Sequence, residues 1–220
     1  MQIETNTATL SELLKSSTQS IHGQVEGQNF IRRLFSGNFT TAEYWLYLWS
    51  LHQVYTRLEE SMSTQRFHPA VSKIFFCSLQ RKGALESDLS FWQEGQMAVP
   101  KDLKLAVEQY RERLKVITEQ DPSLLVSHAY VRYLGDLSGG QMISKRLKQR
   151  WNHNIGFAFY DFNQVDNITE LKQEYRKRLN HIGEMFPEKI ETICSEANTA
   201  FELNGKIFSA LDSCPSLSNS

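Results

Sequence analysis

The chain has few cysteines, no long apolar run and no excess of charge of either sign. Its three cysteines among 220 residues are too few and too scattered for a disulfide framework or a cysteine metal site. They indicate a reducing compartment. Lysine and arginine number 24 against 25 acidic residues, so there is no basic field of the kind that nucleic-acid-binding proteins carry. We therefore expect no nucleic-acid partner.

Two further absences concern membranes and domain boundaries. No apolar run approaches the roughly 20 residues that span a bilayer, and the N-terminus lacks the basic and then apolar order of a secretory signal. No linker rich in proline, glycine and serine divides the chain. We expect one soluble domain over residues 10–212 without a membrane anchor, between a flexible N-terminus (1–9) and a polar tail (213–220).

Helical periodicity runs through nearly the whole sequence, and no convincing alternating strand interrupts it. The pattern predicts an all-α protein whose longest irregular connection is 151–167. The expected helices cover 10–27, 28–36, 40–63, 69–77, 80–94, 101–120, 122–150, 168–184 and 187–211.

One predicted helix contains three glycines, Gly135, Gly139 and Gly140. Each costs about 1 kcal/mol relative to alanine inside a helix, so some other interaction must offset them. At about 100° per residue the three glycines and Asp136 share one side of the helix. A bare face admits either a second helix or a flat ligand. A carboxylate there is unfavourable against a dry helix and easier in a hydrated ligand pocket; the glycines also predict a kink.

The first predicted helix offers a ligand for a flat group that contains a metal. His22, Lys15 and Glu26 fall within about 40° of one another on the helical wheel, beside an apolar stripe. Lys15 lies about 10 Å along the axis from His22, a distance that suits a porphyrin carboxylate. Glu26 could accept a hydrogen bond from the second ring nitrogen. An ordinary surface or core histidine is the alternative. A di-iron bundle is disfavoured because the sequence has no Glu-x-x-His pair.

Four segments together resemble the haem oxygenases, a likeness that extends from about Leu10 to Leu211. They are HAYVRYLGDLSGGQ from His128, IHGQVEGQNF around His22, LKQEYRKRLN from Leu171 and AFELN from Ala200. The resemblance implies a single-domain helical bundle in which haem b lies between a proximal N-terminal helix and a glycine-kinked distal helix.

The resemblance also implies roles for individual residues. His22 would be the axial ligand of the haem iron, with Glu26 as its hydrogen-bonding neighbour. Asp136 would hold water near bound oxygen, while Gly139 and Gly140 would allow close contact with the oxygen and the ring. Further candidates for haem contact are Lys15, Tyr130, Gly135, Lys172, Arg176, Phe201, Asn204 and Phe208.

Several of these residues also have ordinary interpretations. Lys172 and Arg176 lie on one helical side and could form a solvated charged face. Arg132 could support the distal water network or form a surface ion pair. Asn204 could be a packing residue with a satisfied amide or part of a buried water network. Phenylalanines at helical spacing, as at 201 and 208, are usually core residues.

In this family haem is both cofactor and substrate. The resemblance implies cleavage at a meso carbon, the α carbon, to biliverdin, carbon monoxide and ferrous iron with O2. A non-catalytic haem carrier or sensor is the alternative. No flavin or nicotinamide fingerprint is present, which implies an external electron donor such as ferredoxin or a reductase, in the cytoplasm or plastid stroma. Basic residues that could bind an acidic donor are Arg32, Arg33, Lys145, Arg146, Lys148 and Arg150.

Overall fold

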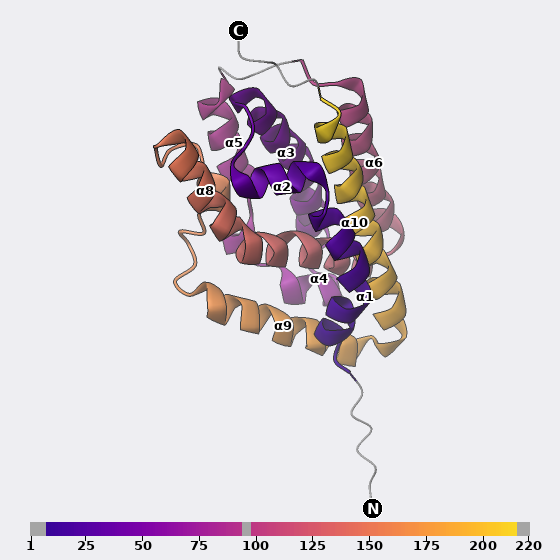
Figure 1. The fold of residues 1–220 in the computed structure, drawn as a ribbon. Coiled ribbons are helices and arrows are strands. Elements are labelled where there is room, and N and C mark those ends of the chain that lie inside the picture. Colours follow the sequence, from indigo (N-terminus) through magenta and orange to yellow (C-terminus); the bar gives the residue numbers. More distant parts are fainter. Residues whose placement is uncertain (1–7, 94–97, 215–220) are drawn as a thin grey trace, which may run out of the picture.

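Helices form the regular structure of the computed structural model, which describes residues 8–93 and 98–214 (Figure 1). No strand occurs within these ranges, so the all-α prediction is confirmed. Residues 1–7 and 215–220, which make up most of the expected flexible N-terminus and polar tail, lie outside the described residues. The α-helices are α1 (Leu10–Glu26), α2 (Asn29–Ser36), α3 (Thr41–Thr64), α4 (Pro69–Ile74), α5 (Lys82–Phe91), α6 (Lys101–Gln120), α7 (Leu125–Ala129), α8 (Gln141–Trp151), α9 (Ile168–Met185) and α10 (Ile190–Asp212).

Short helical turns join or extend several of these elements. The 3-10 turns are η1 (Cys77–Leu79), η3 (Pro122–Leu124), η6 (Ala158–Tyr160) and η7 (Pro187–Lys189). Side chains cap several starts: Thr40 accepts a hydrogen bond from the Glu43 amide at α3, and Asn167 does the same for two amides of α9. The expected irregular stretch 151–167 thus contains one helical turn, η6.

The predicted helix 122–150 is not a single α-helix. Between α7 and α8 the chain forms two π-helical segments, η4 (Tyr130–Leu134) and η5 (Asp136–Gly140). Hydrogen bonds from residue i to i+5 widen these turns, and such segments are frequent at functional sites. The expected kink therefore takes the form of widened turns, which the 100° helical wheel does not describe. We call residues 130–140 the distal segment.

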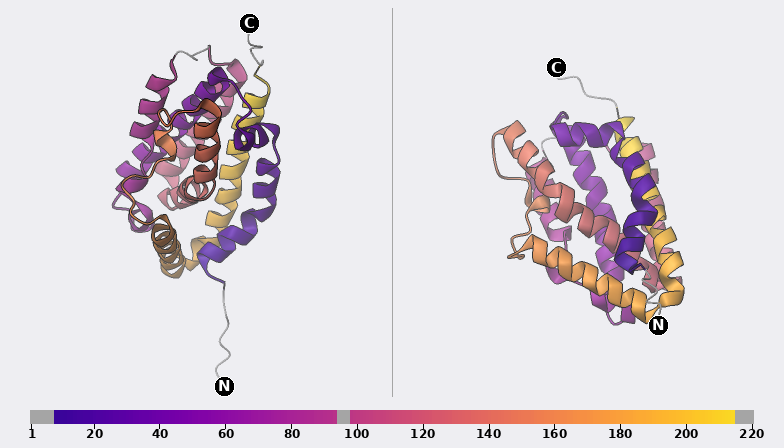
Figure 2. Two further views of the ribbon diagram at one scale, coloured as in Figure 1. Left: turned by 60° about the vertical axis from the view of Figure 1, so that its left-hand side comes forward. Right: turned by 60° about the horizontal axis from the view of Figure 1, so that its bottom comes forward.

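Helix α1 packs along α10 and crosses the end of α9 (Figures 1 and 2). Two glycines permit this close approach. A Cβ on Gly183 of α9 would stand 2.9 Å from the Leu10 Cβ, and a Cβ on Gly205 of α10 would stand 3.3 Å from Val25 Cγ2. These close contacts fix the position of α1. In Figure 1 the distal segment lies between α2 and α9.

The helical period of residues 187–211 predicts one broad apolar stripe along the last helix, and in the structure this stripe of α10 is buried in the core. Ile193, Ala197, Ile207 and Leu211 are each at most 3% exposed. Full burial of the three larger side chains, Ile193, Ile207 and Leu211, contributes about 1.5–3 kcal/mol each, so α10 is held firmly against α1 and α6. It is a rigid support for the polar residues that it carries.

Candidate functional site

His22 lies on an accessible face of α1. Its ring nitrogen Nδ1 is 3.4 Å from Glu26 Oε2, and the two side chains are 50% and 56% exposed. The ring meets the edge of Phe201 from α10, with centroids 5.4 Å apart and planes at 82°. One side of the imidazole is thus oriented by Glu26 and Phe201, while the ring remains open to a ligand.

The glycines of the distal segment have different surroundings. Within the described ranges, no atom outside its own helix lies within 4 Å of a Cβ built on Gly135, and the Phe35 ring, at 3.9 Å, is all that comes this near to one on Gly139. Gly140 differs, because a Cβ there would stand 3.1 Å from Tyr160 Cδ1. The open face that the helical wheel predicts for all three glycines therefore does not extend to Gly140, because the Tyr160 ring lies at its bare side.

Asp136 is held inside the protein by two other polar side chains. The Tyr55 hydroxyl donates a hydrogen bond to Oδ2 of Asp136, and Arg132 Nη2 lies 3.7 Å from Oδ1. Burial raises the pKa of Asp136, although the charge of Arg132 and the Tyr55 hydrogen bond act in the opposite direction. The Asp136 side chain is 12% exposed, so it is shielded but not sealed from the surface of the distal segment.

Arg132 is buried rather than at the surface, with 7% of the residue exposed. Its Nη1 donates to Asn204 Oδ1 at 2.7 Å, and its Nε donates to the Tyr55 hydroxyl at 3.3 Å. The surface ion pair that the sequence left open is therefore excluded. Asn204 also donates to the Ala200 carbonyl at 2.7 Å, so its amide is satisfied by protein groups.

A second polar group extends this arrangement away from the distal segment. Burial raises the pKa of Tyr110 to about 12, although the charge of Arg132 and a hydrogen bond with Asn204 oppose the rise. The Tyr110 hydroxyl is 3.2 Å from His128 Nδ1, and His128 Nε2 is 2.8 Å from Glu196 Oε1. Arg113 completes the series by pairing with Glu196. A connected row of polar side chains thus runs from Asp136 to the partly exposed Arg113.

Tyr130 brings the distal segment against α1 and α9. Burial raises its pKa, while a hydrogen bond with Thr18 of α1 and the charge of Arg176 on α9 oppose that shift. Lys15 and Arg176 are exposed and Lys172 is half-buried. Among the described residues none of these three cations forms an ion pair, so all three are available to an anionic ligand.

Two of the basic residues expected to meet an electron donor are occupied elsewhere. Arg33 pairs with Glu43 and Asp212, and Lys148 Nζ is 3.1 Å from Asp161 Oδ1. A polar surface cavity of about 510 Å³ lies beside α8. It is lined by Gln141, Ser144, Lys145, Lys148, Gln149, Asn152, His153, Asn154 and Asp161, and by none of the candidate haem residues.

Comparison with known proteins connects this geometry to a family. The family model described as "Heme oxygenase" matches residues 8–210. The chain belongs to the heme oxygenase family. It is 38% identical to heme oxygenase 1 of Rattus norvegicus over 216 residues, which cover 96% of this chain and 74% of the rat protein. Heme oxygenase 2 of Oryctolagus cuniculus is 39% identical over 93% of this chain and 67% of its own length.

Solved structures of heme oxygenases have the same fold. Heme oxygenase-1 from Synechocystis sp., crystallised in complex with heme, superposes with a TM-score of 0.83 at 34% identity and 93% coverage of both chains. The enzyme from Leptospira interrogans gives a TM-score of 0.82 at 33% identity, with 92% of this chain and 99% of that chain covered. Family membership makes the chain an oxygenase that acts on haem. Across residues 8–93 and 98–214, none of its helices has the length and apolarity to cross a bilayer.

The residues of this heme oxygenase family member fit a haem group. An exposed imidazole can serve as a neutral nitrogen ligand, and Glu26 lies where it can fix the ring orientation. Gly135 presents backbone without a side chain to open space, so a flat ring could approach the distal segment closely.

Sequence reasoning gave no role to Tyr55, Tyr110, His128 or Glu196. Tyr55 lies within the apolar run of α3, where an aromatic side chain is ordinarily a core residue. His128 opens the family motif but stands before the glycines. The sequence signal for these residues was the presence of polar groups on otherwise apolar helical faces. That signal does not show which groups meet, because the contacts join residues as far apart in the chain as Tyr55 and Asp136.

Proposed function

We propose that the chain binds haem b between α1 and the distal segment and cleaves it at the α meso carbon to biliverdin, carbon monoxide and ferrous iron. The reaction uses O2 and electrons from an external donor. Haem, when bound, supplies both the iron that activates dioxygen and the ring carbon that is oxidised. One observation carries the proposal: a shielded carboxylate, Asp136, is fixed by Tyr55 and Arg132 beside a backbone surface that lacks side chains.

The proximal residues bind and orient the substrate. His22 would hold the haem iron through its free ring nitrogen, and Glu26 would accept a hydrogen bond from the N–H of the other ring nitrogen, so the imidazole would keep one tautomer. Lys15, Lys172 and Arg176 carry unpaired charge toward the propionates, and Tyr130 adds a hydroxyl from the distal segment. Phe201 packs against the edge of the His22 ring, and Phe208 stacks on Phe30 at 5.9 Å, which supports the same side of the pocket.

The distal residues act on the substrate through ordered water and not by direct contact. The Tyr55 hydroxyl proton is directed at Asp136 Oδ2, and Arg132 balances the charge of the carboxylate. Asp136 therefore acts as an acceptor that orders water rather than as an acid aimed directly at the substrate. Gly139, together with Gly135, leaves room for that water and the ring, whereas Gly140 seats Tyr160 beneath the segment.

A non-catalytic haem carrier or sensor would need His22 but not the buried polar group around Asp136. Shielding Asp136 and Arg132 from bulk water carries a desolvation cost, and binding of haem alone would not require it. The presence of Tyr55, Arg132 and Asn204 around Asp136 therefore favours the enzyme.

The external electron donor is proposed to be a soluble acidic protein such as ferredoxin, or a reductase. Arg32, Lys145, Arg146 and Arg150 are exposed on α2 and α8, and these helices touch where Gly37 meets the Arg150 side chain. Their charges are not neutralised by ion pairs within the described residues, so they can attract an acidic partner.

The test combines haem, a reductant and oxygen with the purified chain. The unmodified protein should lose its haem absorption band as biliverdin absorption grows. Asp136→Ala should bind haem with similar affinity but give at least about tenfold less biliverdin, the factor expected for loss of one hydrogen bond to a charged acceptor. The exposed Asp166→Ala is the matched control and should behave like the unmodified protein. Normal biliverdin yield from Asp136→Ala would refute the assigned role.

A further inference from the structure

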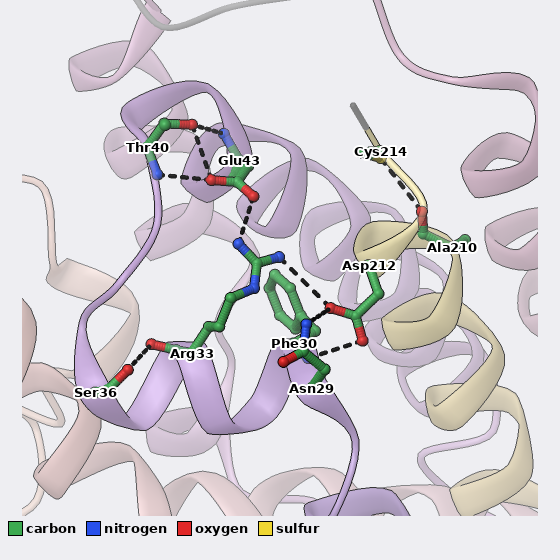
Figure 3. A network of polar contacts seen from close by, with 9 residues as sticks. All are labelled: Asn29, Phe30, Arg33, Ser36, Thr40, Glu43, Ala210, Asp212 and Cys214. Carbon is green, nitrogen blue, oxygen red and sulfur yellow. Dashed lines mark hydrogen bonds and ion pairs between the residues drawn. The ribbon is translucent and has the colours of Figure 1, made fainter. Parts of the chain in front are cut away.

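The N-terminus of α2 is capped by a residue that is distant in sequence. The Gln28 side chain at its N-cap position makes no capping hydrogen bond. Instead Asp212, the last residue of α10, accepts a 2.8 Å hydrogen bond from the Phe30 amide through Oδ2 and a 3.1 Å bond from the Asn29 side chain through Oδ1 (Figure 3). A carboxylate in this position satisfies a free amide and complements the helix dipole.

Arg33, one turn further along α2, extends this contact to a third helix. Its Nη1 donates to Glu43 Oε1 at 2.5 Å, and its Nη2 is 3.5 Å from Asp212 Oδ1 (Figure 3). Glu43 also accepts hydrogen bonds from the backbone amide and hydroxyl of Thr40 at the start of α3. We call Asp212, Arg33 and Glu43 the clamp, because they join α10, α2 and α3.

The ion pairs of the clamp are partly shielded from solvent, which strengthens the attraction between their charges. The Glu43 side chain is 6% exposed, and those of Arg33 and Asp212 are 21% and 22% exposed. Charged partners at such sites are screened less than surface pairs, and loss of one leaves another uncompensated. Figure 3 shows the Arg33 guanidinium directed at both carboxylates.

Helix α2 places an aromatic side chain against the distal segment. Phe35 Cζ is 3.9 Å from the position of a Cβ on Gly139. At its other end, the Gln28 side chain donates 3.2 Å hydrogen bonds to the Gly205 carbonyl and the Ser209 hydroxyl of α10. The position of α2 against α10 therefore sets the distance from Phe35 to the glycine surface.

We propose that the clamp holds α2 so that Phe35 closes the haem space beside Gly139. This inference rests on the proposed haem site, and it assigns Asp212, Arg33 and Glu43 as positioning residues, because they act through Phe35 and not by contact with haem. When the clamp is broken, α2 loosens against α10, and bound haem is released faster.

Asp212→Asn tests the proposal with two measurements. Hydrogen–deuterium exchange of the α2 amides, in the chain without haem, should accelerate about fivefold, the factor expected when a helix cap is lost. Transfer of haem from the ferric complex to a haem-scavenging protein should accelerate by a similar factor. Asp212→Glu, which keeps the carboxylate, should recover part of both effects.

Asp121→Asn is the matched control. Asp121 accepts a hydrogen bond from the Ser123 amide at 3.3 Å and pairs with Lys189 at 2.6 Å, and its side chain is 26% exposed. The same chemistry is removed far from α2, so both rates should stay at the level of the unmodified protein.

Unchanged α2 exchange in Asp212→Asn would overturn the clamp. Faster exchange with unchanged haem release would overturn the role of α2 in closing the haem space. Failure of the unmodified chain to bind haem would contradict the proposed function instead, and the exchange measurement would still decide whether the clamp holds α2.

Discussion

Arg132 Nη1 donates a 2.7 Å hydrogen bond to Asn204 Oδ1, and this bond joins the distal segment to α10. Both residues are buried, at 7% and 5% exposed. Helix α10 also carries Phe201, which packs against His22. The same helix therefore contacts both sides of the proposed haem site. The orientation of Arg132, and through it that of Asp136, is thus set by the core.

Replacement of Asn204 by leucine should destabilise the protein without haem by about 1–3 kcal/mol, because the buried Arg132 loses an acceptor. Urea denaturation measures this. Asn198→Leu is the control on the same helix, since Asn198 is partly exposed and donates to its own helix backbone at 3.0 Å. Equal losses in the two variants would show that the Arg132 bond contributes nothing particular to stability.

Tyr55→Phe should separate haem binding from haem cleavage. The variant keeps the ring but removes the hydroxyl that donates to Asp136 and accepts from Arg132, so haem affinity should hold while biliverdin yield falls several-fold. The expected drop is about tenfold or less, in line with the loss of one positioned hydrogen bond. Tyr133→Phe, next to Tyr55 in the core, should leave the yield intact. A biliverdin yield from Tyr55→Phe equal to that of Tyr133→Phe would show that the Tyr55 hydroxyl has no role in haem cleavage.

Two glycine substitutions should have opposite effects. Gly183→Ala places a Cβ 2.9 Å from that of Leu10, and such overpacking costs about 1–3 kcal/mol of stability. Gly135→Ala meets no described atom within 4 Å, so stability should stay the same or rise by up to about 1 kcal/mol. Haem affinity should nevertheless fall for Gly135→Ala, as measured by titration. A stable Gly183→Ala, or a Gly135→Ala variant with full haem affinity, would contradict this division.

The stability of the turn under the distal segment should depend on pH. Asp88 accepts 2.8 Å hydrogen bonds from the Ala158 and Phe159 amides, and burial raises its pKa from 3.8 to about 6. Between these values the native state binds more protons than the unfolded state, so the free energy of unfolding falls as pH rises through the window. The decline is at most about 3 kcal/mol, at roughly 1.4 kcal/mol per pKa unit.

Asp88→Asn removes this titration, because an amide does not ionise in the window. Urea unfolding of both proteins from pH 4 to pH 7 should show the stability advantage of the unmodified chain shrinking as pH rises. Parallel pH profiles for the two proteins would mean that the Asp88 carboxyl keeps an ordinary pKa.

The sequence was sufficient to predict the relative positions of side chains that lie on one helix. The spacing of His22 and Glu26 placed them one turn apart, and the structure has their side chains 3.4 Å apart. The apolar stripe of the last helix followed in the same way from its period. Such local relationships depend only on the geometry of a single α-helix.

Relationships across helices, and departures from the α-helix, could not be predicted in this way. The distal segment forms π-helical turns and the bare side of Gly140 faces Tyr160, and a helical wheel indicates neither feature. Arg33 looked like a surface cation in the sequence but is paired with Glu43 and Asp212. Its second partner lies 179 positions away in the chain, so only the tertiary fold brings them together.

The most direct test of the account is the axial bond between His22 and the haem iron. Resonance Raman spectra of the ferrous haem complex should show an iron–histidine stretching band in the unmodified protein. In His22→Ala this band should be lost and added imidazole should restore an iron–imidazole band, while Glu26→Gln should keep the band at a shifted frequency. An unchanged iron–histidine band in His22→Ala would contradict the account, because haem would then be bound through a different residue.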